Sequence, residues 1–142
     1  MRLLTSSIII TFLAIGAVSI AQSQWSVQPS GTTETLLGVQ FVDANTGIAV
    51  GTSGKILRTT NGGSGWLSQT SGTTRFLRDV AFPNTSTGFA VGELGIILRT
   101  TNGGTAWTSQ TSGTTSTFVH VHFIDANVGT AVGLDGVVRR TT

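Results

Sequence analysis

Three arginines recur at one spacing along this 142-residue chain, and they are its clearest candidates for recognition chemistry. Arg58, Arg99 and Arg140 lie 41 residues apart. A guanidinium is a planar fork of N–H donors that suits carboxylates and phosphates. In a ring of repeats the three would form one cationic band, so we predict that they bind a partner. The alternative is that each arginine bonds turn carbonyls of its own repeat.

Catalytic groups are harder to assemble from this sequence. The chain has no cysteine and no tyrosine, which removes disulfides, thiolate chemistry and a tyrosine nucleophile. A two-carboxylate glycosidase needs a facing pair of acids, and repeat position pairs none of the acids persuasively. The acids are Glu34, Asp43, Asp79, Glu93, Asp125 and Asp135. We therefore predict no catalytic residue and no enzyme.

Metal sites are weakly indicated. His120 and His122 flank Val121 on an expected strand, so they project to the same side of it. Two imidazoles placed in this way could supply two ligands of a metal site. No third ligand recurs nearby, and we expect a solvated or channel-facing pair. The repeated Asp-x-Asn-x-Gly at 43–47 and 125–129 lacks the later acid of a calcium loop, so a hairpin turn is expected. No metal or cofactor is predicted.

The charge of the chain argues against nucleic acid as a partner. Lysine and arginine number 8 against 6 for aspartate and glutamate. No block of like charge exists, so the basic footprint of a nucleic-acid-binding surface is missing.

The candidate residues are positioned by an internal repeat of 41 residues. Trp25, Trp66 and Trp107 mark it, and Ser-Gly-Thr-Thr recurs at 30–33, 71–74 and 112–115. A period of about 40–45 residues with four short strands is typical of a β-propeller blade. The strands expected in the first full repeat span 36–42, 48–51, 55–60 and 66–69. The fold class is therefore all-β, a β-propeller of four-stranded blades with about three blades present.

The strand count predicts an incomplete ring. Residues 25–28 align with a fourth strand, and the last repeat stops after its third. Closed propellers have about 4–8 blades, so three blades do not close alone. We expect a fragment of a six- to eight-bladed ring, or copies that self-associate to complete the ring. The isolated chain is then unstable or oligomeric.

Residues 1–23 have the features of a signal peptide. Arg2 precedes an apolar run from 8 to 20, and small residues follow it. The alternative is a retained transmembrane anchor, since the run approaches the length of a span. We expect cleavage, with propeller repeats over 24–142 and no stable membrane span afterwards. The mature chain is then exported, to the periplasm, the cell surface or the medium.

A turn motif in two copies resembles the Asp-box, or bacterial neuraminidase repeat (BNR), with asparagine in place of the usual aspartate. The copies share Thr-x-Asn-x-Gly-x-x-Trp, and their residues are Thr59, Asn61, Gly63, Trp66, Thr100, Asn102, Gly104 and Trp107. A hydroxyl and an amide oxygen can bond the turn backbone, while the tryptophan packs on the hairpin. We predict a structural role for these residues.

A longer pattern resembles the photosystem II stability/assembly factor family (Ycf48/Hcf136-like propellers). It runs Trp-x-x-Gln-x-Ser-Gly-Thr-Thr, then Leu-x-x-Val-x-Phe, then Gly-x-Ala-Val-Gly-x-x-Gly-x-Ile-Leu-Arg-Thr-Thr-Asn-Gly-Gly. The resemblance covers residues 25–142 and implies an exported, seven-bladed propeller that assists an early reaction-centre subunit. It also implies a basic surface toward a protein partner, in line with the recurrent arginines.

Taken with the missing catalytic groups, the pattern predicts a non-catalytic, exported scaffold for protein–protein interaction. The alternative is part of a secreted Asp-box glycoside hydrolase or of a carbohydrate-binding propeller. In a sugar binder the tryptophans would be stacking platforms, but they coincide with the structural turn. The sequence does not name the protein partner, the full blade number or the host.

Overall fold

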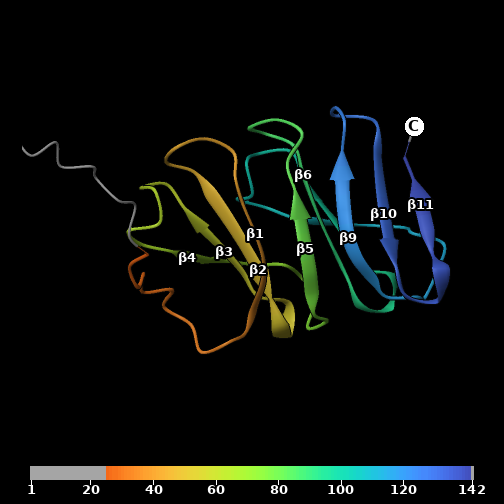
Figure 1. The fold of residues 1–142 in the computed structure, drawn as a ribbon, viewed down its shortest axis with the longest axis horizontal. Helices are drawn as coiled ribbons and strands as arrows, with labels where there is room; N and C mark the ends of the chain where they lie inside the picture. The colour runs from red at the N-terminus through yellow and green to blue at the C-terminus, as the bar shows by residue number, and fades with distance from the viewer. Residues whose placement is uncertain (1–24, 142) are drawn as a thin grey trace, which may run out of the picture.

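The computed structural model describes residues 25–141, which form three antiparallel sheets standing in a row (Figure 1). The first sheet contains β1 (Leu36–Phe41), β2 (Gly47–Gly51), β3 (Ile56–Thr59) and β4 (Leu67–Gln69). The second contains β5 (Leu77–Ala81), β6 (Gly88–Gly92), β7 (Ile97–Thr100) and β8 (Thr108–Gln110). The third contains β9 (Phe118–Phe123), β10 (Gly129–Gly133) and β11 (Val138–Arg140). Each sheet pairs its strands in chain order, so the predicted propeller blades are confirmed.

The strand bounds of the first blade agree with those expected from the sequence repeat to within one residue at each end. The exception is the segment 25–28, which was predicted as a fourth strand and forms no strand in the structure. A strand is stabilised by its neighbour, and no described strand lies beside this segment. The expected signal peptide at 1–23 lies outside the described residues. Among the residues that are described, no helix is long and apolar enough to cross a membrane.

A short 3₁₀ turn links the second and third strands of every blade. These turns are η1 (Thr52–Gly54), η2 (Glu93–Gly95) and η3 (Leu134–Gly136). Their middle residues have positive φ: 55° at Ser53, 52° at Leu94 and 55° at Asp135. The next residue must be glycine in the first two turns, because a Cβ on Gly54 or Gly95 would collide with a backbone carbonyl of the following connection. In the first two blades the turn therefore packs tightly against the connection that leaves the blade.

The core lies between the blades. Apolar side chains of β2 and β3 meet the inner strands of the second blade, and Trp107 completes this cluster. A second cluster joins Ala81 and Val91 of the second blade to Phe118, Val121, Ala131 and Val137 of the third. The second blade is thus covered on both faces, which explains why its strands are apolar on both sides.

Candidate functional site

Each of the first two blades has a turn closed by one threonine and one asparagine, which we call the box turn (residues 59–66 and 100–107). Thr59 Oγ1 donates to Asn61 Oδ1 at 2.8 Å and accepts the Gly63 N–H at 3.0 Å. Asn61 Oδ1 also accepts the Gly65 N–H at 2.9 Å. Thr59 is buried, so its hydroxyl depends on these partners. Both side chains are committed to the backbone of their own turn.

The second box turn repeats this arrangement, and a tryptophan seals it. Thr100 Oγ1 donates to Asn102 Oδ1 at 2.9 Å and accepts the Gly104 N–H at 3.0 Å. The Trp107 indole N–H donates to Gly104 O at 3.1 Å. Its ring meets Phe82 edge-on at 6.0 Å, as Trp66 meets Phe41 in the first blade. This is the bonding and packing that a structural turn requires.

The structure places the three recurrent arginines at equivalent positions with different surroundings. Arg58 is half-buried, and its Nε donates to the Gly103 carbonyl of the next blade at 2.8 Å. Arg99 is exposed and lies over the Phe89 ring, 5.9 Å from its centroid. Arg140 is exposed at the end of β11. Arg58 thus bonds a turn carbonyl across a blade boundary, whereas Arg99 and Arg140 present their guanidinium groups to solvent.

Most carboxylates act as acceptors inside the fold. Asp43 Oδ1 accepts the N–H groups of Asn45 and Thr46 at 2.8 and 2.7 Å. These backbone donors lower the pKa of Asp43 below its ordinary value. Asp125 caps the equivalent turn of the third blade, and its pKa is lowered for the same reason. These are hairpin turns, as predicted.

Two other acids brace the 3₁₀ turns. Glu34 accepts hydrogen bonds from the hydroxyls of Thr52 and Ser53, and these bonds lower the pKa of the Glu34 carboxyl. Glu93 accepts from Arg78 at 3.2 Å and from the Phe76 N–H at 3.4 Å. Four of the six acids therefore have structural partners inside a single blade.

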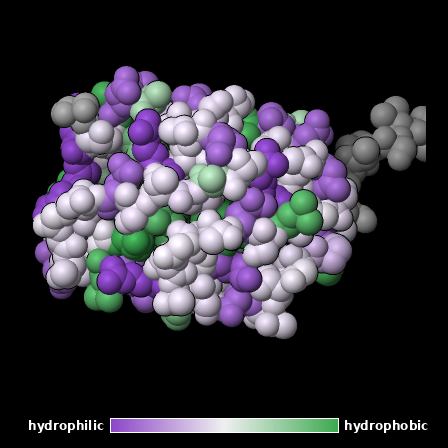
Figure 2. All heavy atoms as spheres, turned by 180° about the vertical axis from the view of Figure 1, so that it is seen from behind, coloured by the Kyte–Doolittle hydropathy of each residue, from purple (hydrophilic) through white to green (hydrophobic). Residues whose placement is uncertain are grey.

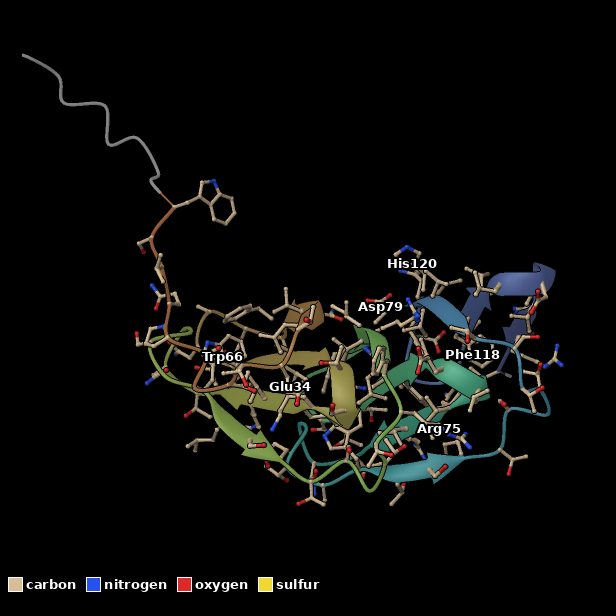
Figure 3. All side chains as sticks on the ribbon, turned by 90° about the horizontal axis from the view of Figure 1, so that it is seen from below. Glu34, Trp66, Arg75, Asp79, Phe118 and His120 are labelled. Atoms are coloured by element: carbon tan, nitrogen blue, oxygen red, sulfur yellow. The ribbon has the colours of Figure 1, made fainter. Side chains whose placement is uncertain are left out.

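One histidine meets a fifth carboxylate, that of Asp79, between two blades. His120 Nδ1 lies 3.4 Å from Asp79 Oδ2 (Figure 3), and the same oxygen accepts the Val121 N–H at 2.9 Å. His122 projects from the same strand and is exposed. Within residues 25–141, no group of three or more histidines and acids lies close enough to hold a metal ion.

Side chains of the innermost strands hold the blades together, which sequence reasoning missed. The Gln40 amide accepts the Phe82 N–H at 2.8 Å and donates to Phe82 O at 3.3 Å. Between the second and third blades, Asp79 Oδ2 accepts the Val121 N–H in the corresponding way. These residues do not align with each other in the repeat, since Gln40 corresponds to Ala81 and Asp79 to Gly38. Repeat alignment therefore gave no signal for them.

A hollow lies between the second and third blades. It has a volume of about 250 Å³, with Phe89, Val91 and Ile97 on one side and Phe123 and Ala131 on the other. Arg139 lines this hollow. Its Nε donates to Ser112 O, in the connection between the second and third blades, at 3.0 Å. On the face opposite to that in Figure 1, apolar residues reach the surface in separate patches among polar ones (Figure 2).

The chain matches a family model and solved structures. The family model described as "Photosynthesis system II assembly factor YCF48" matches residues 17–111, more than half of the chain. A solved structure described as "YCF48 bound to D1 peptide" is similar at 26% identity and a TM-score of 0.72, covering 81% of this chain and 39% of that one. A structure of YCF48 from Cyanidioschyzon merolae gives a TM-score of 0.73 at 20% identity, covering 86% of this chain and 42% of that one, and shows a shared fold. Comparison with the curated proteins gives no match. The chain thus spans about two fifths of the solved structures that it resembles.

Proposed function

The chain belongs to the photosynthesis system II assembly factor YCF48 family, and from that premise we propose that it is a non-catalytic, exported propeller scaffold that binds a peptide segment of another protein. The observation that carries this proposal is the likeness to a YCF48 structure bound to a D1 peptide, which extends over 81% of the chain. A role in photosystem II assembly follows from the same likeness.

The exposed arginines are the proposed contacts for that peptide. Arg99 and Arg140 present guanidinium groups that suit carboxylates. Arg58 has its Nε engaged with Gly103, so we assign it to holding the next box turn beside the contact surface. The partner segment is therefore one that carries acidic groups.

The non-catalytic part of the proposal rests on the use of the acids. A glycosidase requires one acid to donate a proton and a second to act as base or nucleophile. Asp43 and Asp125 each accept two turn N–H groups on Oδ1, while Glu93 is paired with Arg78. These carboxylates are held as acceptors in the blade framework.

The exported part of the proposal rests on sequence alone. A basic residue, an apolar run at 8–20 and small residues after it are typical of a cleaved secretory signal. Mass spectrometry of the chain produced in an exporting host is expected to find a new N-terminus near residue 24. An intact N-terminus at Met1 would contradict export by cleavage.

Binding is tested with a fluorescently labelled D1 peptide and anisotropy titration. The double variant Arg99→Ala/Arg140→Ala is expected to weaken binding at least about tenfold, and the remaining affinity should depend less on salt. Lys55→Ala is the matched control, because it removes a cation at the opposite end of the third strand. Peptide binding that the double variant leaves unchanged would contradict the assigned surface, and absence of binding would contradict the proposed function.

A further inference from the structure

The second box turn contains an asparagine followed by a glycine, Asn102-Gly103. In this dipeptide the main-chain nitrogen readily attacks the side-chain amide, because glycine has no side chain to hinder the approach. The turn favours glycine at this position, since its φ is 67° and a Cβ would lie 3.1 Å from Thr85 O. The fold therefore keeps a chemically labile pair in the turn.

The carbonyl that would be attacked, in the side chain of Asn102, is already polarised by the turn. Its Oδ1 accepts hydrogen bonds from Thr100 Oγ1 and from the Ala106 N–H, both at 2.9 Å. Two donors on a carbonyl oxygen stabilise the negative charge that develops there when a nucleophile attacks the carbon. Asn102 is exposed, so water can reach it and ammonia can leave. On this side of the reaction the box turn lowers the barrier.

The nucleophile, the main-chain nitrogen of Gly103, is held back instead. Gly103 is buried, and its N–H donates to Ser86 O in the β5–β6 hairpin at 2.8 Å. At the other side of the same peptide group, the Asn102 main-chain carbonyl accepts the Thr105 hydroxyl at 3.2 Å. These two bonds fix the peptide group, which has to turn and lose its proton before the nitrogen can attack. The folded turn therefore opposes the reaction that its sequence favours.

A residue of the first blade anchors the same glycine from the other direction. Arg58 Nε donates to the Gly103 carbonyl at 2.8 Å across the blade boundary. A hydrogen bond from a charged donor is stronger than one between neutral groups. Gly103 is thus held by its own blade through its N–H and by the first blade through its carbonyl. Movement of this glycine has to loosen the contact between the two blades.

We propose that Asn102 is a deamidation site that the boundary between the first two blades keeps closed, with Arg58 as the residue that guards it. When the boundary opens, the Gly103 nitrogen loses its proton and bonds to Cγ of Asn102, and the side-chain nitrogen leaves as ammonia. Water then adds to one of the two carbonyl groups of the resulting succinimide ring. The ring opens to aspartate or to isoaspartate, and water is the only other reactant.

The two products have opposite effects on the turn. Aspartate keeps the course of the main chain and the Oδ1 acceptor, so the Thr100 hydroxyl and the Ala106 N–H can bond it as before. Isoaspartate routes the main chain through the former side chain and lengthens it by one carbon, so the acceptor and the Gly103 peptide group cannot both return to their places. One product closes the box turn again, and the other keeps it open. A transient opening of the blade boundary thereby becomes a permanent change.

Peptide mapping by mass spectrometry tests the site, and the chain supplies its own reference. Asn61-Gly62 has the same neighbours as Asn102-Gly103, two threonines before it and a glycine after it. In the chain unfolded in urea, the two asparagines should therefore deamidate at the same rate. In the folded chain, Asn102 should deamidate at least about tenfold more slowly than in urea, because the reaction has to wait for local opening.

Arg58→Ala separates guarding by the blade boundary from protection by the turn itself. This variant should speed the deamidation of Asn102 in the folded chain at least about tenfold, because the bond that it removes has a charged donor. The rate in urea should stay the same. Arg99→Ala is the matched control, since it removes a guanidinium at the same repeat position and leaves the bond to Gly103 in place. Circular dichroism checks that both variants are folded during the incubation.

Hydrogen exchange provides a measurement that needs no variant. The Gly103 N–H exchanges only when it leaves Ser86 O, and the same opening frees the nitrogen to attack. As urea is added below the unfolding transition, exchange of this N–H and deamidation of Asn102 should therefore accelerate in parallel. This comparison decides the proposal on the wild-type chain even if Arg58→Ala does not fold.

Three results would overturn the proposal: deamidation of Asn102 that is as fast in the folded chain as in urea, an unchanged rate in folded Arg58→Ala, or deamidation that does not follow exchange of the Gly103 N–H. None of these measurements involves a peptide partner. Failure of the proposed binding function therefore leaves them unaffected.

Discussion

Arg58 and Gly103 are joined across the boundary between the first two blades by a hydrogen bond of 2.8 Å from Nε to the glycine carbonyl. Gly103 belongs to the second box turn and is buried. The arginine of one blade therefore holds the turn of the next in place. The bond gives the recurrent arginine a structural use in addition to any contact with a partner.

Replacing Arg58 with alanine should destabilise the fold by about 1–3 kcal/mol, because a charged donor is lost from a partly buried carbonyl. Arg99→Ala is the matched comparison, since Arg99 occupies the same repeat position but is exposed. Its cost should stay within about 0.5 kcal/mol. The measurement is the free energy of unfolding in urea, and equal losses in the two variants would argue against the Arg58–Gly103 bond.

Asparagine in the box turn should be replaceable by aspartate. The Asn102 side chain bonds through Oδ1, which accepts from Thr100 Oγ1 and the Ala106 N–H. Asn102→Asp preserves both acceptors and should change stability by less than about 0.5 kcal/mol at neutral pH. Asn102→Ala leaves donors unpaired and should cost about 1–3 kcal/mol. Thermal unfolding of the two variants measures these losses of stability. A large loss in Asn102→Asp would show that the amide nitrogen of Asn102 also contributes to stability.

Acid should weaken the blades through the Asp43 and Asp125 turns. Backbone N–H donors hold both pKa values below the unfolded value. The stabilisation is therefore present above the unfolded pKa of about 3.9 and is lost as pH falls through the folded pKa. Urea unfolding between neutral and acid pH should show this loss.

The chain provides its own control for the acid effect. Asn84 occupies the equivalent turn and bonds the N–H groups of Ser86 and Thr87 at 3.0 and 2.7 Å. The double variant Asp43→Asn/Asp125→Asn should therefore fold with the same turns and have a flatter pH dependence. An unchanged pH profile would assign the acid sensitivity to other groups.

Trp107→Ala should be among the most damaging single changes. Trp107 is buried at the blade boundary, packs edge-on against Phe82 and bonds Gly104 O. Losing a buried tryptophan costs about 3–5 kcal/mol. Trp66→Ala should cost less, because Trp66 is only half-buried. Comparable losses in the two variants, measured by chemical unfolding, would contradict the different burial of the two box turns.

The repeat predicted the within-blade structure well for a physical reason. Every strand and turn inside a blade is copied at a spacing of 41 residues, so the Val-x-Phe pattern at 80–82 is reinforced by the same pattern at 39–41. The strand positions, the blade order and the box turns could all be predicted in this way.

The contacts between blades could not be predicted from the repeat. Gln40 clamps the Phe82 backbone, whereas its repeat equivalents are Ala81 and His122. Asp79 clamps the Val121 N–H, whereas its equivalent in the first blade is Gly38. Different residue types at different repeat positions bond the backbone of the next blade. Only the packed structure brings these side chains beside their backbone partners.

These contacts also give the row of blades a polarity. Arg58, Gln40 and Asp79 each reach forward from their own blade, and each binds main-chain atoms of the next one. Because main-chain groups are the same whatever the side chain, these three contacts do not depend on the residue types that they meet in the following blade. Loss or duplication of a whole 41-residue unit would therefore leave main-chain partners in place for contacts of this kind.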